Sequence, residues 1–141
     1  MLVSTKGRYA LRVMIDLAEH EGEGYLPLRD IAGRLSISDK YLESILKTLV
    51  AGRLIEGQRG KGGGYRLTRP AADYTAAEVL RATEGSLAPV SGMDDAEAFA
   101  ASEPRCHEMW QHLDGLIGDY LASVKISDLA TKTLAGNDYV I

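Results

Sequence analysis

Apolar residues recur every three or four positions in the first third of the chain, the spacing of one face of an α-helix. The pattern predicts helices over residues 5–21, 28–35 and 39–51. Ser38 suits the start of the third helix, because its hydroxyl can accept a hydrogen bond from an amide of the first turn. Gly52 suits its end. Two short helices joined by about three residues predict a helix-turn-helix.

The pattern then changes to a hairpin. Residues 54–58 and 65–67 are typical of short strands, and the segment between them is rich in glycine and basic residues. Further on, Thr75 and Glu78 have capping-box spacing at the start of a helix that ends near Gly85. The sequence therefore predicts a mainly α protein with a small β-hairpin, a winged helix-turn-helix.

The C-terminal half predicts a loop over residues 86–104, a long helix over 105–125 and a last short helix over 127–134, which Gly136 stops. The long helix has one apolar stripe, wide enough to pack on its own domain and on a partner. Antiparallel pairing of two such helices would make a homodimer, although a wholly intramolecular helix has the same pattern. The dimerisation candidates are Met109, Leu113, Leu116, Ile117, Tyr120, Leu121 and Val124.

These elements suggest three parts. Residues 1–84 would form the winged helix-turn-helix domain with its following helix, 85–104 a loop and candidate sensory region, and 105–141 the dimerisation helix and C-terminal helix. No segment approaches the roughly 18 apolar residues that span a bilayer, and no signal-peptide pattern opens the chain. We expect a cytoplasmic protein with no membrane contact.

Charge is divided unequally along the 141 residues. The net charge is −4, but residues 1–70 carry 12 Lys and Arg against 8 Asp and Glu, whereas residues 71–141 carry 4 against 12. Contact with phosphates requires a local basic face rather than a basic chain. The N-terminal half is therefore the half expected to meet double-stranded DNA, unless the imbalance is a chance feature of a solvated surface.

The third predicted helix has an apolar back and a polar front. A recognition helix in the major groove needs such a front, and its N-terminal residues reach deepest. Lys47, farther along, suits a phosphate, and Tyr41 lies at the boundary. Any amphipathic surface helix has the same division, so this feature alone does not single out DNA. The DNA-contact candidates here are Ser38, Lys40, Tyr41, Glu43, Ser44 and Lys47.

The glycine-rich loop is flanked by Arg59 and Lys61. Glycines allow close approach of backbone amides to phosphates, and arginine can enter a narrow minor groove. Arg66 and Arg69 add candidate phosphate contacts on the returning side. A flexible hairpin with ordinary surface charges is the alternative. A Walker-type nucleotide loop is absent.

Several motifs occur together in one order: residues 4–11, then Ser38 with Tyr41 to Glu43, then 59–65 with its glycines, then Glu84 with Gly85, Pro89 with Val90, and Trp110. With these motifs the chain resembles the Rrf2 family of bacterial transcriptional regulators over nearly its whole length. The resemblance implies a winged-helix dimer that binds palindromic operator DNA, usually as a repressor. It implies major-groove contact by Glu43, minor-groove insertion of Arg59 and a sensory loop before the long helix.

Several members of that family bind an iron–sulfur cluster through three cysteines and a further ligand. This chain has no cysteine in residues 86–105, and Cys106 and His107 are the nearest ligands. One of each per chain cannot supply the usual set, and a cluster shared across a dimer would need two of each. We therefore expect no cofactor and no metal. The chain is more similar to the cluster-free branch that represses cysteine metabolism in Gram-positive bacteria, on the spacing of residues 85–90 and on Tyr139 and Ile141.

In that branch, control can come from a partner enzyme of cysteine biosynthesis, so a regulatory protein partner, a small molecule or a thiol state are the expected controls. Cys106 is a candidate redox residue, because a thiol near a helix N-terminus can oxidise readily. The alternative is an incidental small side chain.

The sequence favours two other functions less. Against an enzyme, His20, His107 and His112 lack a motif pairing them with a nucleophile or carboxylate. Against a protein-interaction module that has lost DNA binding, the basic glycine loop is retained.

Overall fold

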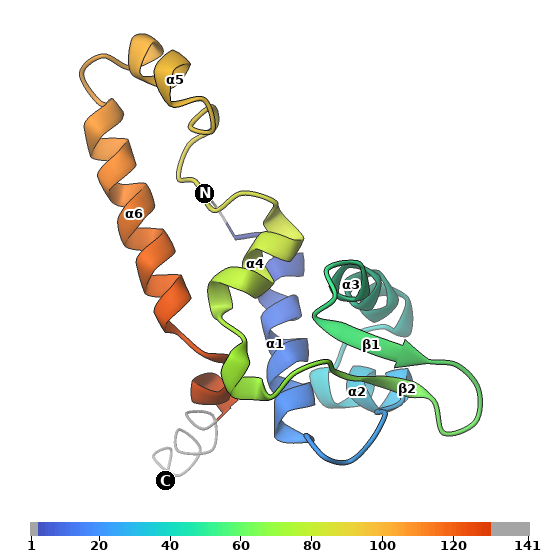
Figure 1. Ribbon diagram of the computed structural model, residues 1–141. Helices are drawn as coiled ribbons and strands as arrows, with labels where there is room; N and C mark the ends of the chain where they lie inside the picture. Colours follow the sequence, from blue (N-terminus) through green and yellow to red (C-terminus); the bar gives the residue numbers. More distant parts are fainter. Residues whose placement is uncertain (1–2, 131–141) are drawn as a thin grey trace, which may run out of the picture.

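The computed structural model describes residues 3–130 and opens with three helices, α1 (Thr5–Glu19), α2 (Leu28–Leu35) and α3 (Asp39–Ala51) (Figure 1). The predicted ends of α2 and α3 are confirmed. Ser38 caps α3, since its hydroxyl accepts a hydrogen bond from the amide of Tyr41. Ser4 does the same for Gly7 at the start of α1. Both hydroxyls satisfy an amide that has no partner inside its helix.

The apolar faces of these helices meet in one core. Burial of such side chains is the main stabilising contribution to the fold. The back of α3 contributes Leu42, Ile45, Leu46 and Leu49, all with no exposed surface, as its spacing predicts. The polar front of α3 is thereby turned outward.

A two-stranded antiparallel hairpin follows, formed by β1 (Ile55–Gln58) and β2 (Gly64–Leu67), in which Ile55 pairs with Leu67. Its outer edge is not free: Leu26 exchanges two backbone hydrogen bonds of 2.8 Å with Tyr65. This third partner fixes the hairpin to the connection between α1 and α2. An isolated hairpin is marginally stable, and the extra pairing supports it.

A short 3₁₀ turn, η1 (Ala71–Asp73), leads into α4 (Ala76–Glu84), which Thr75 caps as predicted. The helix packs along α1. At its C-terminal end, the Glu84 carboxylate accepts hydrogen bonds from the amide and hydroxyl of Ser4. Together α1 to α4 and the hairpin form the body of the molecule.

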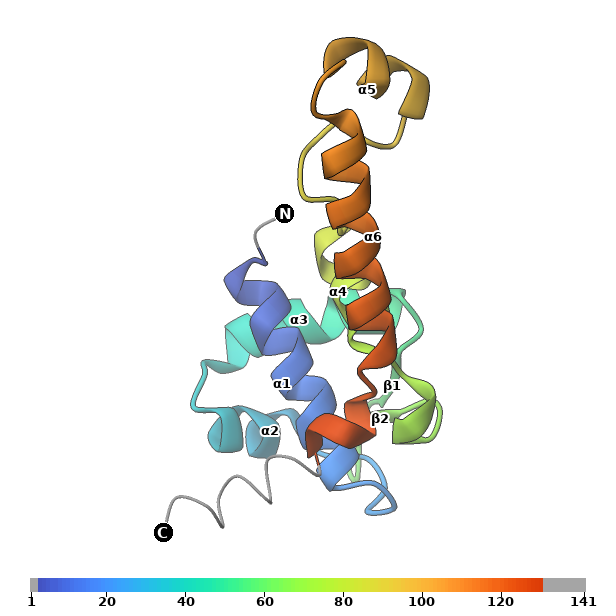
Figure 2. The ribbon, with the colours of Figure 1, turned by 90° about the vertical axis from the view of Figure 1, so that its left-hand side faces the viewer.

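The chain then leaves the body as an arm, formed by α5 (Ala96–Ser102) and α6 (His107–Ser123) (Figures 1 and 2). The prediction that 86–104 is a loop throughout is wrong, because it contains α5. Asp95 caps that helix by accepting from the amide of Ala98, and Phe99 is buried. The acidic residues near Phe99 are typical of a solvated loop. The sequence therefore offers no sign that one of them, Asp95, caps a helix.

The long helix is two residues shorter at each end than predicted, within the usual uncertainty of helix ends. A further helical turn covers residues 126–130 and begins at Ile126 rather than Ser127. The described residues end before several predicted features: the end of this helix at 134, the stop at Gly136, and the residues Tyr139 and Ile141.

The base of α6 is fastened to the body, whereas the rest stands away from it. The amide of Ala76 donates to the carbonyl of Val124, the amide of Ile126 donates to that of Tyr74, and Leu121 packs against the apolar residues of α4. In the described part of the chain, residues 3–130, every residue of α6 is at least partly exposed. In that same part of the chain, no helix combines the length and apolar character needed to cross a membrane.

Candidate nucleic-acid interface

A groove of about 1020 Å³ runs between α3 and the hairpin. Its helix side carries four predicted contact residues, Lys40, Glu43, Ser44 and Lys47, and its hairpin side carries Arg59. Four of these residues lie on α3 and one follows β1, and the fold brings them to one surface. The groove is open to solvent, so it suits an extended ligand better than a small molecule, which usually binds in an enclosed pocket.

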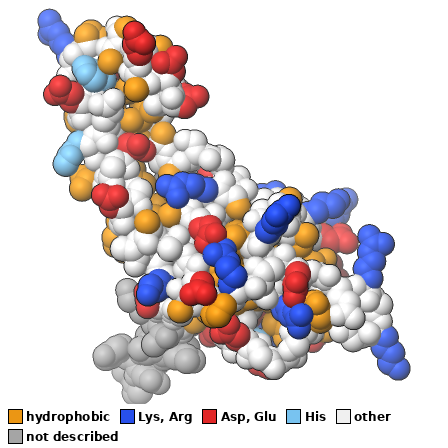
Figure 3. Space-filling view, viewed as in Figure 1, with side chains coloured by type: hydrophobic (Ala, Val, Ile, Leu, Met, Phe, Trp, Pro, Cys, Tyr) orange, Lys and Arg blue, Asp and Glu red, His pale blue; other side chains and the backbone are white. Residues whose placement is uncertain are grey.

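The groove is basic. Lys6, Lys40, Lys47 and Arg59 line it against one carboxylate, that of Glu43. Their side chains make no hydrogen bond or ion pair within residues 3–130, and those of α3 and the hairpin are exposed. In Figure 3 blue side chains project from the edge of the body where the hairpin lies, while red ones gather at the end of the arm. Unpaired cations on one face are the electrostatic requirement for binding phosphates.

Three predicted residues lie next to the groove rather than in its wall. Ser38 is exposed at the N-cap of α3, and Lys61 is exposed in the hairpin loop. Tyr41 is half-buried and meets Tyr9 edge to face, with ring centres 5.7 Å apart. The guanidinium of Arg12 lies over the Tyr9 ring, 4.7 Å from the ring centre. Tyr41 therefore also orients the first turn of α3 against α1.

Arg66 differs from the other predicted residues. Its Nε donates to the Glu56 carboxylate at 2.6 Å, and its guanidinium lies 4.2 Å from the Tyr25 ring centre. The hydrogen bond that Arg66 donates to Glu56 raises the pKa of Arg66, opposed in part by desolvation. Side chains alternate between the faces of a strand, so Arg66 and its neighbour Tyr65 point to opposite sides. Tyr65 lines the groove, and Arg66 lines a separate hollow behind the hairpin.

Among the lining residues that sequence reasoning missed are Lys6, Gln58 and Tyr65. Lys6 lies in the first turn of α1, far from α3 in sequence, and only the packing of α1 brings it to the groove. Its position within the 4–11 motif was the available signal. Tyr65 belongs to β2, where the alternation shows which residues share its face but not which face meets α3, and Gln58 ends β1 beside Arg59.

The glycine run has a structural reason beyond close approach to a ligand. A Cβ on Gly64, which has φ +149°, would fall 2.2 Å from the carbonyl oxygen of Leu26. A Cβ on Gly63 would fall equally close to the carbonyl oxygen of Gln58. Both are far below contact distance, so any side chain at either position would displace backbone. These glycines let the hairpin close on itself and on Leu26.

The predicted dimerisation stripe divides into two faces on α6. Ile117 and Leu121 are half-buried, as is Val124 just beyond the end of the helix, and Leu121 packs against α4. The other four, spaced four, three and four residues apart, are between 37% and 65% exposed, and they are Met109, Leu113, Leu116 and Tyr120. This spacing makes a narrow apolar seam of the kind found between paired helices.

The family model for Rrf2, described as an iron-dependent transcriptional regulator, matches residues 3–132. The chain is 36% identical over 133 residues to the HTH-type transcriptional regulator CymR of Bacillus subtilis, covering 94% of this chain and 92% of that protein. It is 34% identical over 132 residues to the regulator IscR of Photorhabdus laumondii, covering 94% and 80%.

This chain belongs to the Rrf2 family.

Solved structures agree. The structure of CymR, the global cysteine regulator of B. subtilis, superposes with a TM-score of 0.77 at 35% identity over 94% of this chain and 98% of that one. The oxidised form of Staphylococcus aureus CymR gives 0.70 at 34% identity over 92% and 96%. The predicted winged helix-turn-helix fold is confirmed, and this Rrf2 member is a DNA-binding transcriptional regulator rather than an enzyme.

The donor set of this Rrf2 protein does not fit an iron–sulfur cluster. Such clusters are held by several Cys thiolates, with histidine replacing some in certain centres. The full chain has one cysteine, Cys106. Among residues 3–130, no three His, Cys, Asp or Glu side chains are grouped to hold a metal ion. Cys106 is exposed at the N-cap of α6, and neighbouring His107 contacts the carbonyl of Glu103 through Nδ1 at 2.9 Å.

Proposed function

We propose that this protein is a homodimeric repressor that binds a palindromic operator, with α3 in the major groove and the hairpin in the minor groove. Residues 1–84 form the DNA-binding domain, 85–104 the sensory region and 105–141 the dimerisation part. It acts in the cytoplasm, the compartment that holds the operator.

The observation that carries this proposal is the basic groove between α3 and the hairpin. Glu43 and Ser44 stand on the outer face of the first turns of α3, where a helix in the major groove meets base edges. Lys40 and Lys47 flank them for phosphates, and Arg59 extends from the hairpin toward the adjacent minor groove. Ser38, Tyr41 and Lys61 border the same surface. Arg66 has the weakest support, because its guanidinium is already held by Glu56.

Support for a homodimer comes from α6. A helix of 17 residues is about 25 Å long, and this one exposes four large apolar side chains along one line. Monomeric proteins rarely leave such a strip in water, and a second copy of the same helix is the complementary surface. A dimer also explains recognition of two half-sites on one face of DNA.

Control is proposed to act on the arm. CymR of B. subtilis is described as the global cysteine regulator, which favours an effector from sulfur metabolism, such as a partner enzyme of cysteine biosynthesis. Cys106 offers a second control, because its thiol is exposed and the S. aureus relative has been obtained in an oxidised form.

The test is selection of binding sites from random-sequence DNA by the full-length protein, prepared with and without air. Glu43→Gln and Arg59→Ala are compared with the wild type on the selected site. We expect a palindrome, a changed base preference at one position per half-site for Glu43→Gln, and weaker binding for Arg59→Ala.

Selection of no sequence at any salt concentration would contradict the operator-binding repressor. Selection of a site without two-fold symmetry would contradict the homodimer. Visible absorption in the anaerobic sample would contradict control without a cluster, because iron–sulfur clusters are coloured and the apoprotein has no chromophore in that range.

A further inference from the structure

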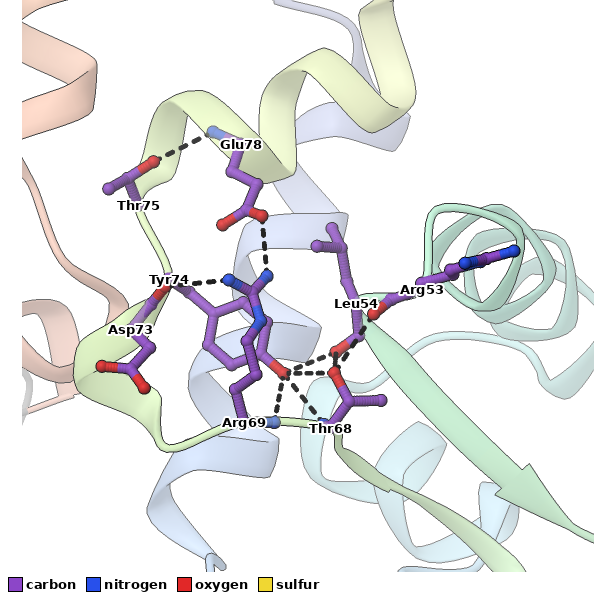
Figure 4. Close-up of polar contacts among 8 residues, drawn as sticks. All are labelled: Arg53, Leu54, Thr68, Arg69, Asp73, Tyr74, Thr75 and Glu78. Carbon is purple, nitrogen blue, oxygen red and sulfur yellow. Dashed lines mark hydrogen bonds and ion pairs between the residues drawn. The ribbon is translucent and has the colours of Figure 1, made fainter.

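Tyr74 lies at the junction of three parts of the molecule. Its side chain has no exposed surface, and it is the largest fully buried residue in the core. It stands between η1 and Thr75, the cap of α4, and its ring reaches under the hairpin (Figure 4). A buried phenol needs partners for its hydroxyl, and these partners define what the residue holds together.

The hydroxyl closes the open end of the hairpin. It donates to the carbonyl oxygen of Leu54 at 2.7 Å and accepts from the amides of Thr68 at 2.9 Å and Arg69 at 3.0 Å. A phenol has one proton to donate and two lone pairs, so these three bonds use its full capacity. Leu54 precedes β1 and Thr68 follows β2, one step beyond the last backbone pair. The hydroxyl therefore joins the two strands at the end opposite the DNA-facing loop.

The same place is the joint between α3 and the hairpin. After α3 the chain turns through Arg53, whose φ of +60° is uncommon for a residue with a side chain. The Thr68 hydroxyl donates to the Arg53 carbonyl at 3.1 Å, beside the Tyr74 hydroxyl (Figure 4). The direction of the hairpin relative to α3 is set at Arg53 and Leu54, and both carbonyls are held by this cluster.

Tyr74 is itself anchored to the arm and to α4. Its carbonyl accepts from the amide of Ile126 at 3.1 Å, just beyond α6. Arg69 covers its ring, with the guanidinium 4.2 Å from the ring centre, and donates to the Asp73 carbonyl and to the Glu78 carboxylate. The anchor of the hairpin is therefore the part of the body to which α6 is fastened.

We propose that Tyr74 is a positioning residue for DNA binding, which fixes the direction of the hairpin so that Arg59 reaches the minor groove while α3 is in the major groove. The inference rests on the proposed groove contacts. Arg59 is five residues beyond Leu54, about 16 Å along a strand, so a small rotation at the joint becomes a displacement of ångströms at Arg59. Tyr74 touches no DNA itself and acts through the hairpin.

The test is a double-mutant cycle on the selected operator, using Tyr74→Phe, Arg59→Ala and the double variant in the full-length protein. Tyr74→Phe keeps the ring and removes only the hydroxyl. We expect it to weaken binding on the order of tenfold in the wild-type background and less than about twofold in the Arg59→Ala background, since coupled residues are non-additive. Hydroxyl-radical footprints of Tyr74→Phe should lose minor-groove protection and keep that around the site of α3.

The matched control is Tyr25→Phe, because the Tyr25 hydroxyl has no hydrogen bond within residues 3–130 and its ring contact with Arg66 survives. It should bind like the wild type. Circular dichroism at the binding temperature establishes that each variant is folded. Should Tyr74→Phe unfold, Thr68→Val serves instead. It leaves the bonds of the Tyr74 hydroxyl to the backbone and removes the contacts of the Thr68 hydroxyl with the Arg53 and Leu54 carbonyls and with the Tyr74 hydroxyl. The same dependence on Arg59 is then expected, with a smaller loss.

Equal losses in both backgrounds, or no loss from a folded Tyr74→Phe, would overturn the inference while leaving the repressor proposal standing. Arg59→Ala binding as tightly as the wild type would overturn both the proposed minor-groove contact and the inference built on it.

Discussion

Arg34 in α2 binds Asp16 in α1 through two hydrogen bonds, with Nε 2.7 Å from Oδ1 and Nη2 2.8 Å from Oδ2. Asp16 is the one buried charged residue within residues 3–130, and Arg34 is about one-third exposed. The hydrogen bond to Asp16 raises the pKa of Arg34, although desolvation opposes the shift. The pair fixes the first helix of the helix-turn-helix on α1.

Removal of Arg34 should destabilise the protein. Arg34→Met leaves the Asp16 carboxylate buried without its cation, and we expect the free energy of unfolding to fall by about 2 kcal/mol, reduced from the cost of a fully buried pair by the exposure of Arg34. Urea unfolding measures this. Arg29→Met, in the same helix at an exposed position with no ion pair among the described residues, is the control. Equal midpoints for the two variants would contradict the prediction.

The basic groove predicts how salt affects binding. Lys47→Ala and Lys6→Ala should each weaken binding to selected and unrelated DNA alike, and each should reduce the slope of log affinity against log salt by about 1, because one phosphate contact is lost. Anisotropy titrations over a range of salt measure the slope. Arg66→Ala should change it less, because Arg66 is paired with Glu56 behind the hairpin. A larger effect at Arg66 would reverse our assignment of the two hairpin faces.

The exposed seam of α6 predicts the oligomeric state. Leu116→Asp puts a charge in the middle of the seam, and we expect dissociation into monomers at micromolar concentration with loss of cooperative operator binding. Sedimentation velocity measures the mass. Ala122→Asp adds the same charge on another face of α6 and should stay dimeric. Two variants of equal mass would place the interface elsewhere.

Cys106 predicts a response to oxidants. Hydrogen peroxide should lower the affinity of the wild type for its operator, and Cys106→Ser should abolish that response while binding normally without peroxide, because the chain has no second cysteine. Reversal by dithiothreitol separates a sulfenic acid or disulfide from irreversible oxidation. A serine variant that remains as sensitive as the wild type would leave Cys106 without a regulatory role.

The parts predicted well from sequence are those set by local interactions. The bounds of α2 and α3 follow from apolar spacing and from the Ser38 cap, which involve neighbours in the chain. The division of α3 into a buried back and an exposed polar front follows from the same spacing. The winged fold could be predicted because each of its elements carries its own local pattern.

The features that the sequence did not predict depend on contacts between distant residues. Arg66 lies behind the hairpin because the opposite face of the hairpin meets α3, and the alternation of a strand cannot reveal which face does so. The position of Lys6 in the groove requires the packing of α1. No sequence pattern pointed to Tyr74. Its hydrogen-bond partners lie 5 to 52 positions away along the chain, and only the folded structure brings them close to it.

The close approach of Leu26 to Gly64 bears on how this regulator can diversify. Substitutions at Gly63 or Gly64 would abolish DNA binding by deforming the hairpin, so their loss of function reports nothing about contact with bases. Arg59 and Lys61, by contrast, have exposed side chains that make no hydrogen bond or ion pair with the described residues 3–130. In the proposed binding mode, new operator preferences can therefore arise, in evolution or in a designed library, by exchanging these two side chains while the hairpin backbone stays unchanged.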